Sequence, residues 1–203
     1  MSESRFSAAD LEPSDDDRRA ILRAQVDRVA ATFAVLAAGV SVGGMVALGA
    51  CAAPFVFSLT PAPHSGYAMG SAFARFDHIA LGAAVVLLAA EVARTWAAGG
   101  RARLVPARVR RIAAFVMAAC AAYIGLVLTP QINDLHRSGV KRGVGAAGVV
   151  LETIHHRAEL VGKIETGLGV ALIALHVFTL ALRRPEDDDD DYAEPLPPGP
   201  RET

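Results

Sequence analysis

The chain has 203 residues and a formal net charge of −1, and 53% of its residues are hydrophobic. These apolar residues are gathered in long blocks rather than spread at amphipathic spacing, which argues against a soluble helical domain. The two cysteines, Cys51 and Cys120, fall inside apolar blocks without C-x-x-C spacing, so a cysteine zinc site is excluded and both are predicted to be packing residues.

The first apolar blocks predict membrane-spanning helices. No Asp, Glu, Lys or Arg occurs from residue 29 to 74 or from 112 to 133. About 20 helical residues, at a rise of ~1.5 Å each, cross the ~30 Å hydrocarbon layer of a bilayer. We therefore predict an all-α integral membrane four-helix bundle. Its spans are predicted at about 29–53, 73–96, 112–130 and 163–182.

Glycines and prolines in the apolar blocks predict packing and helix ends. Gly39 and Gly43 have the small-x-x-x-small spacing that lets two membrane helices approach closely. Pro54 and Pro130 lack a backbone N–H, so they are predicted to end the first and third spans.

Both ends of the chain have compositions typical of disordered tails. Residues 1–25 form a mixed-charge leader, and residues 184–203 combine a run of aspartates with prolines. We predict disordered cytoplasmic tails on either side of a transmembrane domain at 26–183. Ser14, followed by three aspartates, is predicted to cap a short helix within the leader.

Basic residues predict the orientation in the membrane. Fourteen of the 20 lysines and arginines lie in the leader, the 94–111 loop and the tail, and six lie in the other connections. The positive-inside rule then places both termini in the cytoplasm and the 134–162 loop outside. The arginine-rich loop is interpreted as a topology signal beside the lipid bilayer, so no nucleic-acid partner is predicted.

The head of the fourth span, "IHHRAELVGKIETGLG" at 154–169, concentrates ionisable residues. Steps of four and three residues place His156, Glu159 and Lys163 on one helix face. The spacing predicts an ion pair between Glu159 and Lys163 on a solvated helix end.

A metal site is the alternative interpretation of this helix head. His156 and Glu159, joined by Asp77 and His78 from the second span, could supply nitrogen and oxygen ligands to a divalent metal. No other cofactor is predicted. A Glu-x-x-His element ends at His155, but the second such element that a di-iron bundle requires is missing.

His176 is predicted to lie within the membrane. An ionisable side chain at that depth is a candidate functional residue. The favoured alternative is a neutral imidazole that is hydrogen-bonded to a neighbouring helix. No hydrolase, metalloprotease, P-loop or dinucleotide motif occurs, so no enzymatic activity is predicted.

Several short segments resemble a known family. "APFVFSL" at 53–59, "SGYAMGSAFARFD" at 65–77, "LTPQINDLHRSG" at 128–139 and the histidine before the last span are similar to the transmembrane protein 205-like family, domain of unknown function 4149. The resemblance implies a four-helix domain in a bacterial inner membrane. The family's His-x-x-Ser-x-x-x-Asn appears here as His156-x-x-Glu159-x-x-x-Lys163, with two departures.

Three functions stay open at this point. The first is a small binding or transport-associated module, and the second is a structural protein that organises a homo-oligomer or a membrane-protein partner. The third, given least weight, is an intramembrane enzyme. A polar cavity reaching His176 would favour binding or transport, whereas a tightly packed interior would favour the structural role.

Overall fold

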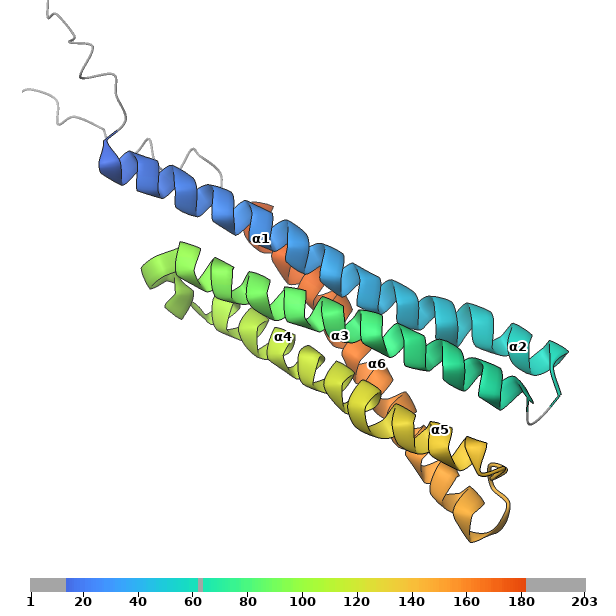
Figure 1. The fold of residues 1–203 in the computed structure, drawn as a ribbon. Helices are drawn as coiled ribbons and strands as arrows, with labels where there is room; N and C mark the ends of the chain where they lie inside the picture. Colours follow the sequence, from blue (N-terminus) through green and yellow to red (C-terminus); the bar gives the residue numbers. More distant parts are fainter. Residues whose placement is uncertain (1–13, 62–63, 182–203) are drawn as a thin grey trace, which may run out of the picture.

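The computed structural model describes residues 14–61 and 64–181, which form four long helical rods (Figure 1). The disorder predicted for 1–13 and for 184–203 lies outside the described residues. The rods and their segments are α1 (Asp15–Val46), the π-helical η2 (Ala47–Ala52) and α2 (Ala53–Leu59); α3 (His64–Ala98) and the 3₁₀ turn η3 (Gly99–Arg103); α4 (Val105–Tyr123), the π-helical η4 (Ile124–Leu128) and α5 (Thr129–Arg137); and α6 (Gly145–Ala181).

The four rods are long and apolar enough to cross a membrane, which confirms the all-α fold class and makes the chain a multi-pass membrane protein. Large apolar side chains such as Val85, Phe115 and Val170 point away from the bundle and are more than half exposed. A lipid environment suits such a surface, because hydrocarbon chains solvate apolar side chains.

The first rod begins earlier than predicted. Ser14 accepts a hydrogen bond from the Asp17 backbone N–H, and the Asp17 carboxylate accepts one from the Ser14 N–H, which together form a capping box. The predicted cap is confirmed. The short helix predicted within the mostly disordered leader is longer than expected, because residues 15–25 are the first turns of α1.

The predicted helix ends at the two prolines are wrong. Just before Pro54, the Ala53 N–H bonds to Leu48 O, five residues back, and just before Pro130, the Thr129 N–H bonds to Ile124 O in the same way. Each proline thus stands in the first turn of a new α-helical segment, where its missing N–H is tolerated. The π segments carry both rods past their prolines.

The predicted packing role of Gly39 and Gly43 is wrong within this chain. A Cβ added at either position would meet no atom within 4 Å. Close approaches occur instead at Gly44, which lies against the Phe76 ring of α3, and at Gly169 of α6, which lies against Val42 of α1. The small residues of α1 therefore do pack, but on a different face of the helix.

The rods form an up-and-down bundle in which α1 packs on α3 and α6, and α4 packs on α3 and α6. The start of α1, η3 and the last described turn of α6 lie toward the same end of the bundle, and α1 begins beyond the other two (Figure 1). At the other end, α2 diverges from the N-terminal half of α6 (Figure 1). That divergence positions the main cavity.

Candidate functional site

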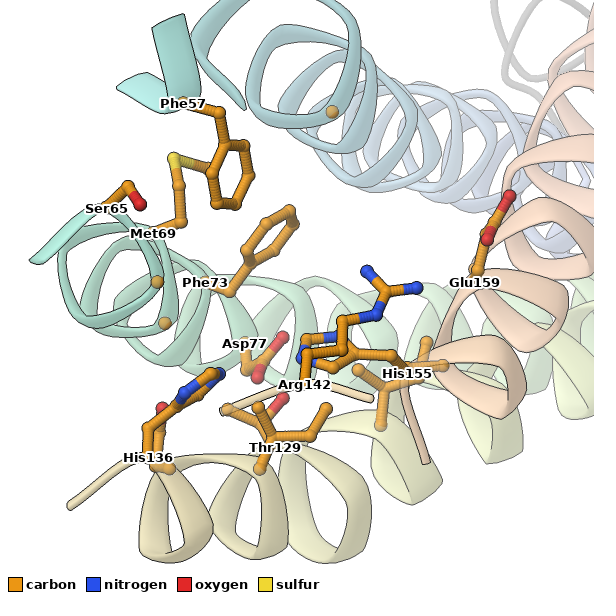
Figure 2. Close-up of a pocket in the computed structure, with 18 of the residues that line it drawn as sticks. Phe57, Ser65, Met69, Phe73, Asp77, Thr129, His136, Arg142, His155 and Glu159 are labelled. Atoms are coloured by element: carbon orange, nitrogen blue, oxygen red, sulfur yellow. The ribbon is translucent and has the colours of Figure 1, made fainter. Parts of the chain in front are cut away.

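A cavity of about 1060 Å³ occupies the end of the bundle where α2 and α6 diverge (Figure 2). One wall is apolar and comes from α1, η2, α2 and the first turns of α3, including Met45, Phe57 and Phe73. Val46 and Phe57 line the cavity and are each about half exposed, so the cavity reaches the surface of the protein. Its size suits a drug-sized or lipid-like molecule.

The opposite wall is polar and comes from α5, the following loop and α6. His136 and His155 meet here edge to face, with ring centroids 5.8 Å apart. Arg142 donates from Nε and NH2 to the Glu152 carboxylate at 2.5 and 2.8 Å, and this bond raises the pKa of Arg142 above its ordinary value. Arg142 of the polar wall thus already has a carboxylate partner.

Asp77 lies at the deep end of the cavity, on α3. Its side chain is 6% exposed, and Thr129 of α5 hydrogen-bonds to its carboxyl group. The second carboxylate oxygen, Oδ2, has no hydrogen-bond partner. Glu165 of α6 is a second buried acid with one unpartnered oxygen, and it interacts electrostatically with Asp77, but it does not line the cavity.

The four predicted metal ligands do not converge. Asp77 faces the cavity, whereas the exposed His78 ring bonds to the carbonyl of Ala74, one turn back in its own helix. His156 is exposed and bridges Glu152, at 3.1 Å, and Glu159, at 3.9 Å. Over residues 14–61 and 64–181, no three His, Cys, Asp or Glu side chains are placed to hold a metal ion.

The ion pair predicted at the head of α6 is confirmed. Lys163 Nζ lies 2.7 Å from Glu159 Oε1, and both side chains are exposed. Both residues also line the cavity, as does the half-buried His155. Neither cysteine shows the buried packing predicted for it, since Cys51 is exposed and Cys120 is only half-buried.

A buried charge network occupies the opposite end of the bundle. Arg94 of α3 is 2% exposed and donates from Nε to Asp27 of α1 at 3.0 Å. It also bonds to His176 Nδ1 and donates to Thr179, at 3.4 Å, both on α6. An arginine N–H can only donate, so His176 Nδ1 accepts and the imidazole is neutral. The predicted hydrogen bond between His176 and a neighbouring helix is thus present.

The fourth helix joins the network through a second buried pair. Arg110 of α4 donates from Nε to both Glu91 oxygens, at 2.8 and 3.0 Å. His176 Nε2 lies 3.2 Å from Glu91 Oε1, although it does not form a well-aligned hydrogen bond. Two acids, two arginines and a neutral histidine thus connect all four rods without net charge.

This network was not predicted from the sequence. Arg94 and Arg110 were interpreted as loop arginines and Asp27 as a residue ahead of the first span, but all three are at most 5% exposed inside the bundle. One available signal was the spacing of Glu91 and Arg94, which puts two opposite charges on one face of a helix at membrane depth. Without these two buried arginines, the side predicted to be cytoplasmic still has twelve basic residues and the other side has six, so the predicted orientation is unchanged.

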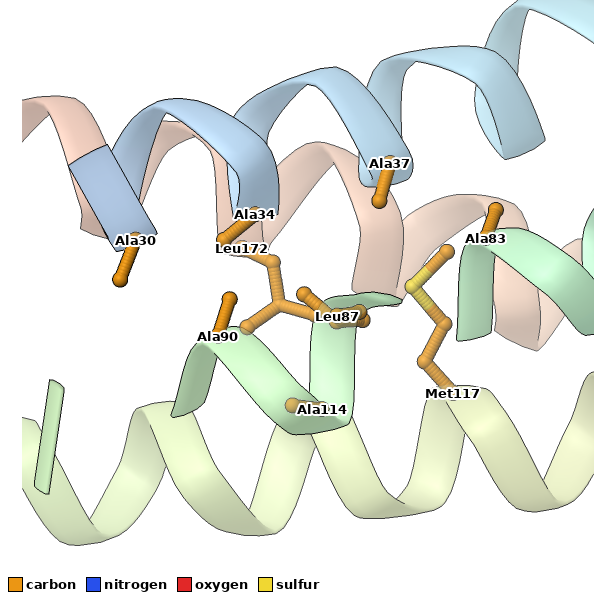
Figure 3. Packing of buried hydrophobic residues seen from close by; sticks show 9 residues of the cluster. All are labelled: Ala30, Ala34, Ala37, Ala83, Leu87, Ala90, Ala114, Met117 and Leu172. Atoms are coloured by element: carbon orange, nitrogen blue, oxygen red, sulfur yellow. The ribbon is translucent and has the colours of Figure 1, made fainter. Parts of the chain in front are cut away.

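An alanine-rich core separates the cavity from the network (Figure 3). Ala30, Ala34 and Ala37 of α1 form one buried cluster with Leu87 of α3 and Leu172 of α6. In each rod, the core residues fall between the network residues and the cavity residues along the chain. The cavity therefore does not reach His176.

A family comparison finds one match. The family described as a domain of unknown function, DUF4149, matches residues 36–141, just over half of the 203-residue chain. Comparison with curated proteins and with solved structures finds no match. The matched stretch contains Asp77, Thr129 and His136 of the cavity, whereas α6 lies beyond it. The chain therefore belongs to the DUF4149 family, whose function is unknown.

Proposed function

We propose that the protein is a small binding or transport-associated module that takes an amphipathic molecule from the lipid bilayer into its cavity. The observation that carries this proposal is the division of the cavity into an apolar wall from α1, α2 and α3 and a polar wall from α5 and α6. A lipid-like molecule matches both walls, because its chain and its head need opposite surroundings. The half-exposed lining residues support entry from the side.

The structural role is the second candidate, and the buried charge network favours it. A network that links four helices can specify one arrangement of the bundle. The closed core between the cavity and His176 also favours a structural role for that end of the bundle, so the proposed binding function is confined to the cavity at the other end. The protein is not proposed to be an enzyme, and that expectation stays a prediction.

We further infer that the membrane is a bacterial inner membrane, with the cavity opening toward the outside. The family resemblance suggests the bacterial membrane. The excess of basic residues at the network end supports a cytoplasmic position for both termini. A homo-oligomer or a membrane-protein partner stays a prediction.

A cavity-filling substitution tests the binding function. Gly49 lines the cavity, and a Cβ there would enter open space, so Gly49→Trp should occupy the cavity. Gly43→Trp, on the outer face of the same rod, is the matched control. We expect native mass spectrometry of protein released from lipid nanodiscs to show a tightly bound amphiphile in the wild type and the control, but not in Gly49→Trp. Equal retention by all three proteins would contradict the proposal.

A further inference from the structure

Asp77 is the exceptional polar group of the cavity. Among the described residues that line it, only Asp77 has a buried side-chain atom without a hydrogen-bond partner. An unsatisfied carboxylate oxygen at membrane depth is costly unless a donor or a proton meets it. In Figure 2, the Asp77 side chain points into the cavity beside Thr129. The deep end of the cavity therefore offers an acceptor that the protein itself leaves without a donor.

We infer that the ligand of this cavity carries a protonated amine, which donates an N–H hydrogen bond to Asp77 Oδ2. This inference rests on the proposed function and specifies the head group of the amphipathic ligand. A charge-assisted hydrogen bond of this kind is about twice as strong as a neutral one. Glu165 of α6 is a second buried acid that interacts with Asp77, and one of its oxygens also lacks a partner.

The cations of the cavity do not favour an anionic head group instead. Arg142 is held by both oxygens of Glu152, and Lys163 is held by Glu159 at 2.7 Å. Lys141 also lines the cavity, but it is exposed and lies in the loop between α5 and α6. Among the described residues that line the cavity, the one buried side-chain atom without a hydrogen-bond partner is therefore an acceptor.

The apolar wall gives the rest of the ligand a place beside the amine. Phe73 and Met69 precede Asp77 by four and eight residues on α3, so they lie on the same face of that helix. They lead from the deep end of the cavity toward Phe57 (Figure 2). An amine at Asp77 would leave an alkyl chain lying along this apolar surface.

Binding of three twelve-carbon amphiphiles to the full chain in phosphatidylcholine nanodiscs tests the inference. The probes are dodecylamine, dodecanol and dodecyl phosphate, measured by equilibrium dialysis and corrected with empty nanodiscs. We expect the wild type to prefer dodecylamine to dodecanol by at least about tenfold, as one charge-assisted hydrogen bond can provide. Asp77→Asn should lose this preference but still bind dodecanol, which shows that the cavity is intact.

Asp134→Asn is the charge-matched control, because Asp134 lies on α5 but does not line the cavity. It should keep the amine preference. Equal binding of amine and alcohol by the wild type, a preference for dodecyl phosphate, or an amine preference that survives Asp77→Asn would overturn the inference alone. Failure of every probe to bind the wild type would instead overturn the proposed function.

A further experiment distinguishes a lipid head group from a free amphipathic amine as the source of the bound amine. In nanodiscs that mix phosphatidylethanolamine with phosphatidylcholine, only phosphatidylethanolamine has N–H groups on its head. If a lipid supplies the amine, native mass spectrometry should find phosphatidylethanolamine retained by the wild type but not by Asp77→Asn. Equal retention of the two lipids, together with tight dodecylamine binding, identifies a free amphipathic amine as the ligand.

Discussion

Arg94 is a permanently charged side chain that is only 2% exposed in the described structure, so its burial is energetically costly unless its charge is compensated. Burial removes the water that would solvate the guanidinium, and Asp27, His176 and Thr179 replace it with acceptors from two other helices. Such a network stabilises the bundle only while every member is present, since removing one partner leaves a buried charge without compensation.

Substitution of Arg94 should therefore cost far more stability than substitution of an exposed arginine. We expect Arg94→Leu to lower the free energy of unfolding by about 3–5 kcal/mol, because it removes one partner of a buried ion pair. Arg108→Leu, at an exposed position of α4, should change it by less than about 0.5 kcal/mol. Detergent-unfolding curves measure both variants, and a similar small loss in each would contradict the network's role.

His176 could be predicted from the sequence, but its partners could not. A lone histidine within an apolar block stands out as an ionisable residue at depth. Asp27, Arg94 and Arg110 lie near the ends of such blocks. When a span is defined as a stretch without charged residues, these three residues fall outside it and are assigned to loops. Their burial depends on how far each helix continues past the apolar block. That length is decided by tertiary contacts rather than by local hydropathy.

At the scale of the elements, both proline-containing rods continue as helices past a residue that normally interrupts helical hydrogen bonding. A proline inside an α-helix removes one hydrogen bond and crowds the carbonyl four residues before it. In this bundle, a single π-helical segment precedes each proline, and its backbone N–H groups bond to carbonyls five residues back instead of four. The sequence rule that a proline ends a span was therefore too simple for Pro54 and Pro130, since a widened turn lets the rod continue.

Neighbouring glycines on α1 test which helix face packs. Gly44→Ala would place its Cβ on the Phe76 ring, so we expect a destabilisation of about 1–3 kcal/mol from overpacking. Gly43→Ala enters open space and should be neutral or stabilise the helix by up to about 1 kcal/mol, because alanine has the higher helix propensity.

Melting temperatures of the purified variants distinguish the two sites. Destabilisation of Gly43→Ala, with Gly44→Ala unchanged, would show that the Gly39 and Gly43 face makes the close contact after all, either within the chain or between copies of it.

At the scale of the whole molecule, apolar block lengths were enough to predict four spans and an all-α fold. The cavity could not be predicted in this way, because it depends on the divergence of α2 from α6 (Figure 1). Asp77 was singled out from the sequence, but for a metal site with His78 and His156, which the structure does not assemble. Adjacent residues on a helix point in different directions, so Asp77 reaches the cavity while His78 remains exposed.

Cysteine labelling tests the orientation of the bundle. In a chain whose Cys51 and Cys120 have been replaced by alanine, Arg103→Cys should react with an impermeant maleimide only from the cytoplasmic side. Ser138→Cys, in the exposed connection at the cavity end, should react only from the outside. Labelling in the opposite sense would place the cavity on the cytoplasmic side.

Photo-crosslinking tests most directly the central claim that the cavity holds an amphipathic molecule. A twelve-carbon amine with a diazirine in its chain is irradiated with the protein in nanodiscs, and the modified residues are identified by peptide mass spectrometry. The account predicts crosslinks concentrated on the cavity wall, at Phe57, Met69 and Phe73, and their loss in Gly49→Trp. Crosslinks spread evenly over outward-facing residues such as Val85, Phe115 and Val170, and unchanged in Gly49→Trp, would contradict it.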